Sequence, residues 1–259
     1  MKSDLGSAIS AWLKDYIENN NLECFVIGVS GGVDSAVVST LCAHTGSPTI
    51  VLNLPINSKQ GNTKLSNDHC IWLKNNFPNV KVFYMELSNV FETFDSLMDL
   101  TDNRSNLASA NSKSRLRMMT LYHIATAHSG IVVGTGNKVE DFGVGFYTKY
   151  GDGGVDISPI ADLTKTQVRA LGTELQILPS ILSAPPTDGL WEDSRTDEEQ
   201  IGASYEELEW AMQHLEENSN KELTDRQQQV INIYMGFHNK NKHKMIPIPV
   251  FSLAEVEDE

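Results

Sequence analysis

A glycine-rich turn near the start of the chain carries the first residue types that could do chemistry. Gly28–Ser35 reads GVSGGVDS and overlaps the end of an apolar run, Cys24–Val29, that is typical of a buried strand. Gly31 and Gly32 let the backbone bend tightly and approach a phosphate without an intervening Cβ. A helix that begins just after them would add free N–H groups and a positive dipole end. The stretch therefore predicts a phosphate-binding loop.

The side chains of this loop differ from those of a Walker A loop. Ser30 and Ser35 offer hydroxyl groups, but the Gly-Lys-Ser/Thr ending is absent. Asp34 stands at the expected helix start, where a carboxylate repels phosphate unless it holds a cation. We therefore expect Asp34 to bind a Mg²⁺ that bridges the phosphates. The alternative is a plain glycine turn between a strand and a helix, which the serine and aspartate positions disfavour.

A second polar, glycine-rich block, Gly134–Pro159, reads GTGNKVEDFGVGFYTKYGDGGVDISP. Thr135 follows the apolar run IVVG, and Glu140 supplies a carboxylate that could complete an oxygen-rich Mg²⁺ site with Asp34. The block also presents Phe146, Lys149, Asp152 and Asp156 among its glycines. Taken alone, Glu140 is equally consistent with a solvated loop acid, and the glycines with ordinary turns.

The elements that must position these residues alternate along the first half of the chain. Strands are predicted over Cys24–Val29, Thr49–Leu54, Val80–Met85 and Ile131–Gly134. Helices are predicted over Asp34–His44, Asn62–Asn75, Val90–Met98 and Ser105–His128, after an amphipathic opening helix. Such alternation predicts an α/β fold, a doubly wound parallel sheet with helices on both faces. Ligands of these sheets bind beyond the carboxyl ends of the strands, where both glycine-rich blocks fall.

The second half predicts a helical C-terminal extension of the same single domain, residues 1–259. Helices are expected over Leu163–Leu175, with Thr164 as its cap, over Ser204–Glu216 and over Leu223–Asn239. The Pro- and acid-rich stretch Ser183–Asp197 is a candidate mobile loop. Residues 252–259 form an acidic tail.

Composition limits the classes of partner. The 259 residues carry a formal net charge of −14 and are 40% hydrophobic. An acidic chain lacks the basic face that nucleic-acid phosphates require, and the N-terminal residues contain no apolar run of signal-peptide or membrane-span length. Cys24, Cys42 and Cys70 lack CxxC spacing and are typical of buried thiols in a reducing compartment. We expect a cytoplasmic protein that binds neither nucleic acid nor membranes.

The loop SGGVDS resembles the pyrophosphate-binding loop of the N-type ATP pyrophosphatases, whose fold is adenine nucleotide alpha hydrolase-like. In that superfamily the loop holds the β- and γ-phosphates while the α-phosphorus is attacked, which implies adenylation. The block Gly134–Pro159 is similar to the NAD synthetase segment GT-x4-E followed by G-F-x-T-K-[FY]-G-D-G-x-x-D, and the similarity extends over nearly the whole chain. The chain thus resembles the ammonia-dependent members of the NAD synthetase family.

The resemblance implies a role for each matching residue. ATP would be bound by Gly28, Ser30, Gly31, Gly32, Asp34, Ser35, Thr135, Lys165 and Thr187. The deamidated substrate would be contacted by Asn111, Arg115, Phe146, Lys149, Asp152, Asp156, His243 and Lys244. Mg²⁺ would be held by Asp34 and Glu140. Asp152 and Lys165 would be catalytic, because Lys165 can neutralise charge developing at the α-phosphorus. Asn111 and Arg115 lie four apart and so share a helix face.

The chain departs from the family pattern in three small ways. Gly136 stands where an Asp is common, Val33 replaces a frequent Gln, and the stretch between Glu140 and Gly145 is one residue longer than in several relatives. The extra residue bears on the metal assignment of Glu140, because it changes how that carboxylate is presented.

The implied reaction converts nicotinic acid adenine dinucleotide to NAD. A carboxylate oxygen attacks the α-phosphorus of ATP, pyrophosphate leaves, and ammonia then displaces AMP from the acyl-adenylate. Asp152 is the candidate proton acceptor. Glutamine-using relatives carry a further amidohydrolase domain with a nucleophilic cysteine, for which this chain has no room. Free ammonia is therefore expected, unless a separate subunit supplies it. The family also implies a homodimer.

Three other functions fit parts of the sequence. Another adenylating amidotransferase could use the same loop, but the FYTKYGDGGVD stretch and the HK pair at His243 speak against it. A tRNA sulfur-transfer enzyme would need catalytic cysteines and a basic surface. A nucleotide sensor without catalysis is disfavoured by the candidate residues Asp34, Lys165 and Asp152.

Overall fold

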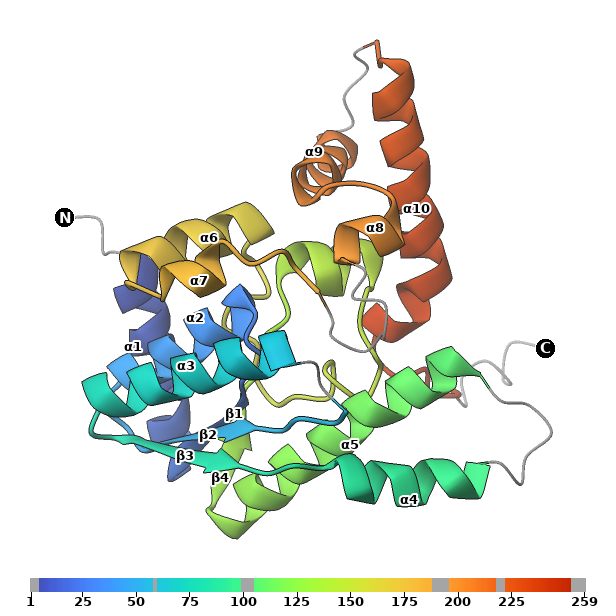
Figure 1. The fold of residues 1–259 in the computed structure, drawn as a ribbon. Helices are drawn as coiled ribbons and strands as arrows, with labels where there is room; N and C mark the ends of the chain where they lie inside the picture. The colour runs from blue at the N-terminus through green and yellow to red at the C-terminus, as the bar shows by residue number, and fades with distance from the viewer. Residues whose placement is uncertain (1–4, 58–59, 99–104, 188–195, 218–221, 253–259) are drawn as a thin grey trace.

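A computed structural model describes residues 5–57, 60–98, 105–187, 196–217 and 222–252 (Figure 1). Its elements are, in order, α1 (Leu5–Asn19), β1 (Cys24–Gly28), α2 (Val33–His44), β2 (Thr49–Asn53), α3 (Gln60–Asn76), β3 (Val80–Tyr84), α4 (Ser88–Met98), α5 (Asn106–Ala127), β4 (Gly130–Val132), the π-helix η1 (Val139–Val144), α6 (Lys165–Glu174), α7 (Pro179–Leu182), α8 (Asp197–Ile201), α9 (Tyr205–Glu216) and α10 (Asp225–Met245).

The four strands form one parallel sheet in the order β3-β2-β1-β4. In the centre, Phe25 of β1 lies opposite Thr49 of β2 on one side and Ile131 of β4 on the other. The central strands are apolar without alternation because both of their faces are covered. The predicted doubly wound parallel sheet is therefore confirmed.

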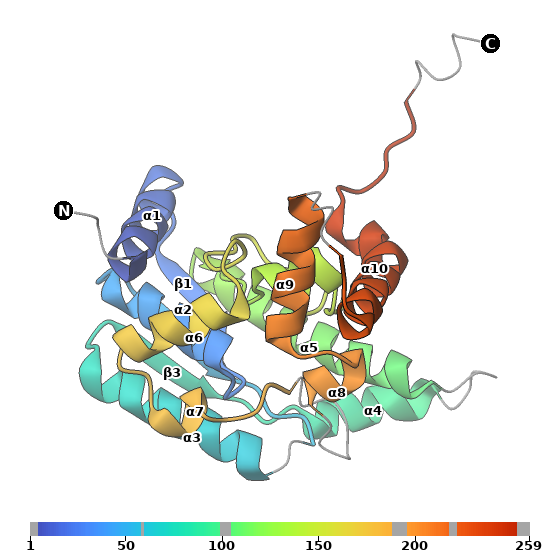
Figure 2. The ribbon, with the colours of Figure 1, turned by 90° about the horizontal axis from the view of Figure 1, so that it is seen from above.

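Helices cover both faces of the sheet (Figures 1 and 2). Helices α1, α2, α3, α6 and α7 lie on one face, where α2 is packed between the sheet and its neighbours α1 and α6. Helices α4 and α5 lie on the other face, over a second apolar cluster built around Val26 and Leu52. The carboxyl ends of the strands stay uncovered by either layer and point toward the loops that follow β1 and β4.

The C-terminal helices α8, α9 and α10 form a separate bundle against η1 (Figure 1). Its apolar cluster joins Val139 and Val144 of η1 to Tyr205 and Leu208 of α9 and to Tyr234 of α10. The burial of these side chains holds the start of the second glycine-rich block against the C-terminal helices. The predicted helical C-terminal extension is confirmed.

Each predicted strand and helix is present, with ends shifted by a few residues. Thr164 caps α6 in a capping box with Gln167, as predicted. Helix α10 runs beyond its predicted end at Asn239, and η1, α7 and α8 were not predicted. Of the candidate mobile loop, residues 188–195 lie outside the described part of the chain, as do residues 253–259 of the acidic tail. The single-domain organisation stays a prediction.

None of the helices within the described ranges combines the length and apolar character needed to cross a membrane. Cys24, Cys42 and Cys70 are buried and free, as predicted.

A buried histidine lies beneath the phosphate loop, between α2 and α3. His69 is fully buried, and its Nε2 is 3.0 Å from Oγ of Ser39. Ser39 donates its hydroxyl proton to the carbonyl of Ser35, one turn nearer the loop, so Nε2–H of His69 is the donor to Ser39. Burial lowers the pKa of His69 from 6.5 to about 4, because the charged imidazolium would lose its hydration.

We predict that His69 makes the fold acid-sensitive. The native protein keeps His69 neutral while the unfolded chain binds a proton below its ordinary pKa, so stability falls as the pH drops from about 6.5 to about 4. The loss is on the order of 3 kcal/mol, from the 1.36 kcal/mol that one pKa unit represents. Urea unfolding of wild type and His69→Gln across this pH range measures it, and the variant should have the shallower dependence.

The matched control is His123→Gln, because His123 is an exposed helix residue. Its pH dependence should follow the wild type. If the free energies of unfolding of wild type and His69→Gln fell in parallel with pH, His69 would not be the acid-sensitive group.

Candidate active site

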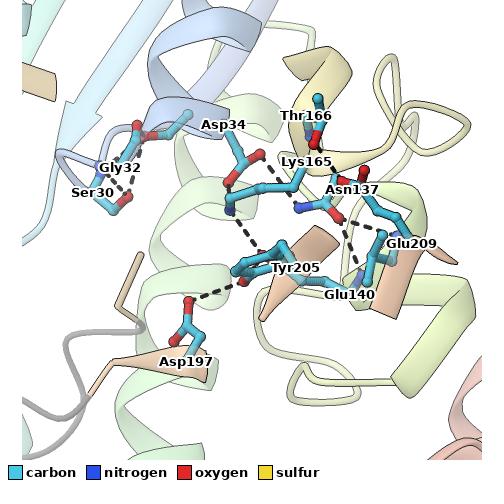
Figure 3. A network of polar contacts seen from close by, with 12 residues as sticks. Ser30, Gly32, Asp34, Asn137, Glu140, Lys165, Thr166, Asp197, Tyr205 and Glu209 are labelled. Carbon is cyan, nitrogen blue, oxygen red and sulfur yellow. Dashed lines mark hydrogen bonds and ion pairs between the residues drawn. The ribbon is translucent and has the colours of Figure 1, made fainter. Parts of the chain in front are cut away.

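The predicted phosphate loop lies between β1 and α2, at the carboxyl end of a central strand. Its two serines hold it in shape: the hydroxyls of Ser30 and Ser35 are 3.2 Å apart, and Oγ of Ser30 accepts from Gly32 N–H at 3.2 Å (Figure 3). Gly31 has φ +93°, which a side chain would strain. Gly32 caps α2 without a side-chain hydrogen bond, so the first N–H groups of the helix face the loop.

Lys165 joins this loop to the second glycine-rich block. Its Nζ lies 2.5 Å from Oδ2 of Asp34 and 2.9 Å from Oε1 of Glu140 (Figure 3). The lysine is 3% exposed and stands in the first turn of α6, where the Thr164 cap fixes the start of the helix. Two predicted metal ligands and one predicted catalytic cation are therefore brought together, although Asp34 lies 131 positions before Lys165 in the sequence.

Burial and charge act against each other in this cluster. Burial alone would lower the pKa of Lys165, but Asp34 and then Glu140 outweigh it, so the pKa is raised and the ammonium keeps its charge. Burial would raise the pKa of Glu140, but the Lys165 charge and the Tyr205 hydroxyl lower it below its usual value. A buried lysine between two carboxylates is stable because each charge has a close partner.

Two further residues, neither of them predicted from the sequence, complete the cluster. Asn137, fully buried, donates to Oδ1 of Asp34 at 3.4 Å and accepts from Glu140 N–H at 3.1 Å. Tyr205, also fully buried, donates its hydroxyl to Oε1 of Glu140 at 2.5 Å (Figure 3). Asn137 stands within the quoted GTGNKVE motif, so its place was a usable signal. Tyr205 lies outside every motif, and its sequence neighbours mark only a helix start.

The donor set fits a Mg²⁺ that shares its ligands with phosphates. Mg²⁺ in nucleotide-using enzymes is held by one or two carboxylates together with substrate phosphates and waters. Asp34 and Glu140 supply two carboxylates beside the phosphate loop, and Lys165 and Tyr205 both contact Oε1 of Glu140 rather than Oε2. Within the described ranges no cluster of three or more His, Cys, Asp or Glu side chains forms an all-protein metal site.

The stretch between Glu140 and Gly145, predicted to be one residue longer than in several relatives, forms a π-helix. The segment η1, Val139–Val144, has the wide π turn, and Gly145 ends it with φ +63°. Such turns are rare and are frequent at functional sites. Glu140 lies at the start of η1, where its Oε1 is 2.9 Å from Nζ of Lys165.

The π turn also explains the glycine at position 136. A Cβ at Gly136 would lie 2.0 Å from Oδ2 and 2.3 Å from Cγ of Asp141. The Asp141 carboxyl group therefore occupies the space that a side chain at position 136 would need. Burial raises the pKa of Asp141 well above its ordinary value, and the charges of Glu140 and Asp152 add to this.

The second half of the candidate site is built on α5 and the loop after η1. Oδ1 of Asp152 accepts from Ser114 Oγ at 2.7 Å and from Thr148 N–H at 3.0 Å. Asn111 accepts from the Thr148 hydroxyl at 2.7 Å, and Arg115 donates to the carbonyl of Lys149 at 3.3 Å. The helix face that carries Asn111 and Arg115 is thus directed at this loop. The Asp152 carboxylate is held in place by these hydrogen bonds, and Asp152 is nevertheless exposed to solvent.

The end of α10 and this loop are tied together through backbone carbonyls. Nζ of Lys149 donates to the carbonyl of His243 at 3.0 Å. Nζ of Lys244 donates to the carbonyls of Gly145 and Tyr147. Phe146 packs against the apolar cluster of η1, α9 and α10. The predicted substrate residues at these positions therefore gather in one place, where they fix the loop to the helix.

The remaining predicted residues lie at the edges of the site. Asp156 accepts from the Tyr122 hydroxyl at 2.8 Å and from Val132 N–H at 2.9 Å, so both of its oxygens fasten the loop to α5 and β4. Thr135 follows β4 at the carboxyl end of the sheet. Thr187 lies just before a segment outside the described residues. The residue before it, Pro186, accepts a hydrogen bond at its carbonyl oxygen from Asp197 N–H at 3.1 Å.

We predict that Gly136→Asp destabilises this protein, although the family resemblance led us to expect an Asp at this position. The new side chain would overlap the Asp141 carboxyl group, and overpacking of this kind costs about 1–3 kcal/mol. The free energy of unfolding in urea measures the loss. The double variant Gly136→Asp/Asp141→Ala should recover most of it, because the space is then vacated.

The single variant Asp141→Ala is the matched control and should not be destabilised, since it removes a carboxyl group whose ionised form is disfavoured by burial and by the neighbouring acids. Equal stability of Gly136→Asp and wild type would show that Asp141 does not occupy this space.

Comparison with known proteins places this site in a family. The model of the family described as NAD synthase matches residues 5–247. The NH(3)-dependent NAD(+) synthetase of Alkaliphilus metalliredigens is 35% identical, over 93% of this chain and 96% of its own. That of Staphylothermus marinus is 33% identical, over 96% of this chain and 91% of its own.

Solved structures agree with the sequence relatives. The NMN synthetase from Francisella tularensis matches with a TM-score of 0.84 and 31% identity, over 96% of this chain and 98% of that one. The NH3-dependent NAD synthetase from Campylobacter jejuni shares the fold, with a TM-score of 0.77 at 23% identity over 96% and 97% of the two chains. The matches span nearly the full length on both sides, and the chain belongs to the NAD synthase family.

Proposed function

We propose that the chain catalyses the ATP-dependent amidation of nicotinic acid adenine dinucleotide to NAD with ammonia, through an acyl-adenylate and with release of AMP and pyrophosphate. The observation that carries the proposal is the contact of Lys165 with both Asp34 and Glu140. It places the phosphate loop beside the block whose sequence resembles the substrate segment of the family. The family relatives named as ammonia-dependent synthetases support the same reaction.

In the first step, a carboxylate oxygen of the dinucleotide forms a bond to the α-phosphorus of ATP and the bond to pyrophosphate breaks. The N–H groups of Gly28–Ser35 and of the α2 start stabilise the negative charge that gathers on pyrophosphate. Lys165 lies beside the loop and adds a fixed positive charge for the α-phosphoryl oxygens. Thr135 and Thr187 are the further proposed ATP contacts.

Asp34 and Glu140 are the proposed ligands of Mg²⁺, with the ATP phosphates completing the shell. When bound, the ion supplies Lewis-acid stabilisation of the phosphoryl charge. The chain's own part is to hold the two carboxylates at a fixed separation, which Lys165, Asn137 and Tyr205 do through the contacts already described.

In the second step, ammonia forms a bond to the activated carbonyl carbon and the bond to AMP breaks. Asp152 is the proposed acceptor of the proton that the nitrogen loses. Its Oδ1 is held by Ser114 and Thr148, which leaves Oδ2 for the incoming nitrogen. The proposed substrate contacts are Asn111, Arg115, Phe146, Lys149, Asp156, His243 and Lys244.

Asp152→Asn should lower turnover at saturating ammonium by about 10²-fold or more, the usual contribution of a positioned proton acceptor. The adenylation half-reaction, followed as exchange of labelled pyrophosphate into ATP, should survive because it needs no proton transfer to Asp152. Asp162→Asn is the matched control, since the Asp162 side chain is 96% exposed and forms an ion pair with Lys138, away from Asp152 and its partners. Unchanged turnover in Asp152→Asn would remove Asp152 from this role.

A mononucleotide is the second candidate substrate. The Francisella tularensis protein with 31% identity and a TM-score of 0.84 is an NMN synthetase, which is named for a product without the adenylate half. The chemistry at the carboxylate would be the same, and only the binding of the adenylate half would differ.

The test supplies purified protein with ATP, Mg²⁺ and ammonium, and with either nicotinic acid adenine dinucleotide or nicotinic acid mononucleotide. NAD and AMP formed in equal amounts, at a higher kcat/KM than NMN and AMP, are the expected result. A preference for the mononucleotide establishes the second candidate. Glutamine in place of ammonium should give no product, and AMP formation without either amide would contradict both candidates.

We also propose that the protein works as a homodimer, on the basis of the family resemblance. Light scattering on the purified chain should give twice the mass of one 259-residue chain. A monomeric mass with full activity would contradict this.

A further inference from the structure

Tyr205 is a fully buried side chain whose polar end meets the charged cluster. Its hydroxyl donates to Oε1 of Glu140 at 2.5 Å, and its ring lies under Nζ of Lys165, 4.8 Å from the ring centroid (Figure 3). The ring packs in the apolar cluster of α9, α10 and η1. A phenylalanine would fill the same space, so packing alone does not require the hydroxyl. A buried tyrosine hydroxyl needs a partner, and here the partner is a proposed metal ligand.

The same residue connects the cluster to the chain that follows Thr187. The Tyr205 hydroxyl lies 3.3 Å from Oδ2 of Asp197, and Tyr205 N–H donates to Glu198 at 2.9 Å. Asp197 N–H in turn donates to the carbonyl of Pro186 at 3.1 Å. A continuous set of polar contacts therefore runs from the residue before Thr187 through Asp197 and Tyr205 to Glu140.

We propose that Tyr205 is a positioning residue for the amidation reaction: its hydroxyl fixes the orientation of the Glu140 carboxylate toward the nucleotide phosphates and their cation. The proposal rests on the proposed function. A glutamate side chain has several freely rotating bonds, and Lys165 alone, whose three N–H donors can follow a moving carboxylate, would not fix it. The second contact, from Tyr205 to the same oxygen, restricts the rotation of the Glu140 carboxylate and leaves Oε2 outside both hydrogen bonds.

Steady-state kinetics of Tyr205→Phe test the proposal. The variant keeps the ring and removes only the hydroxyl. We expect kcat/KM for Mg-ATP to fall about 10–100-fold, the usual effect of losing a partner that orients a metal ligand. The Mg²⁺ concentration for half-maximal rate should rise, while the KM for the dinucleotide stays unchanged. A general loss of structure would impair the kinetics of both substrates and not those of Mg-ATP alone.

The matched control is Tyr234→Phe. Tyr234 is buried in the same apolar cluster, on α10, and its ring lies against Gly143 rather than against Glu140. Tyr234→Phe also removes one tyrosine hydroxyl. It should leave the KM for Mg-ATP, the KM for the dinucleotide and the Mg²⁺ requirement unchanged. In a Glu140→Ala background, Tyr205→Phe should have no further effect on Mg-ATP, because two residues that act through one contact are not additive.

Three results would overturn the proposal: unchanged Mg-ATP kinetics in Tyr205→Phe, an equal loss for both substrates, or a full additional loss in the Glu140→Ala background. If Tyr205→Phe fails to fold, Asp197→Asn removes the charged group that competes with Glu140 for the single hydroxyl proton. The contact with Glu140 then stays, so the Mg²⁺ concentration for half-maximal rate should not rise, and a rise would overturn the proposal. A wild type without product in the same assay would contradict the proposed function, and is thereby distinguished from failure of this inference.

Discussion

The ion pairs of Lys165 are the interaction on which the rest of the site depends. A lysine that is 3% exposed is tolerated only because Asp34 and Glu140 both lie within 3 Å of its Nζ. Those carboxylates come from the phosphate loop and from the π-helix, so the same contact that satisfies a buried charge also sets the distance between the two loops. If the ammonium were lost, the carboxylates of Asp34 and Glu140 would face each other without a neutralising cation, which favours separation of the loops.

The fold serves this contact by supplying rigid supports on three sides. The parallel sheet fixes the phosphate loop at the end of β1, and the capped start of α6 fixes Lys165. The third support is the C-terminal bundle. Its apolar cluster packs against η1 and holds the Tyr205 hydroxyl within hydrogen-bond distance of Glu140. The C-terminal helices are therefore part of the nucleotide half of the site as well as of the substrate half, where the end of α10 holds the loop around Lys149.

The sequence predicted the fold closely because its signals there are local. Apolar runs, helix caps and the Gly-Gly turn each depend on a few neighbouring residues, and the parallel sheet with helices on both faces followed from them. The strand order β3-β2-β1-β4 was not predicted. The meeting of Asp34, Glu140 and Lys165 was accessible only through family resemblance. The contact of Tyr205 with Glu140 could not be predicted, nor could the position of the Asp141 carboxyl group where a side chain at residue 136 would lie. Both depend on three-dimensional contacts that no local sequence pattern records. The π-helical form of the stretch after Glu140 was not accessible either, because η1 packs against α10, which is distant in the sequence.

The central claim is that this cluster serves attack at the α-phosphorus of ATP, and the fate of the substrate's carboxylate oxygen tests it most directly. The measurement uses nicotinic acid adenine dinucleotide with its carboxylate labelled with heavy oxygen, and mass spectrometry of the products. Attack at the α-phosphorus predicts that each turnover leaves one labelled oxygen in AMP and none in pyrophosphate. Label in inorganic phosphate, with ADP as the second product, would show attack at the γ-phosphorus and contradict the account.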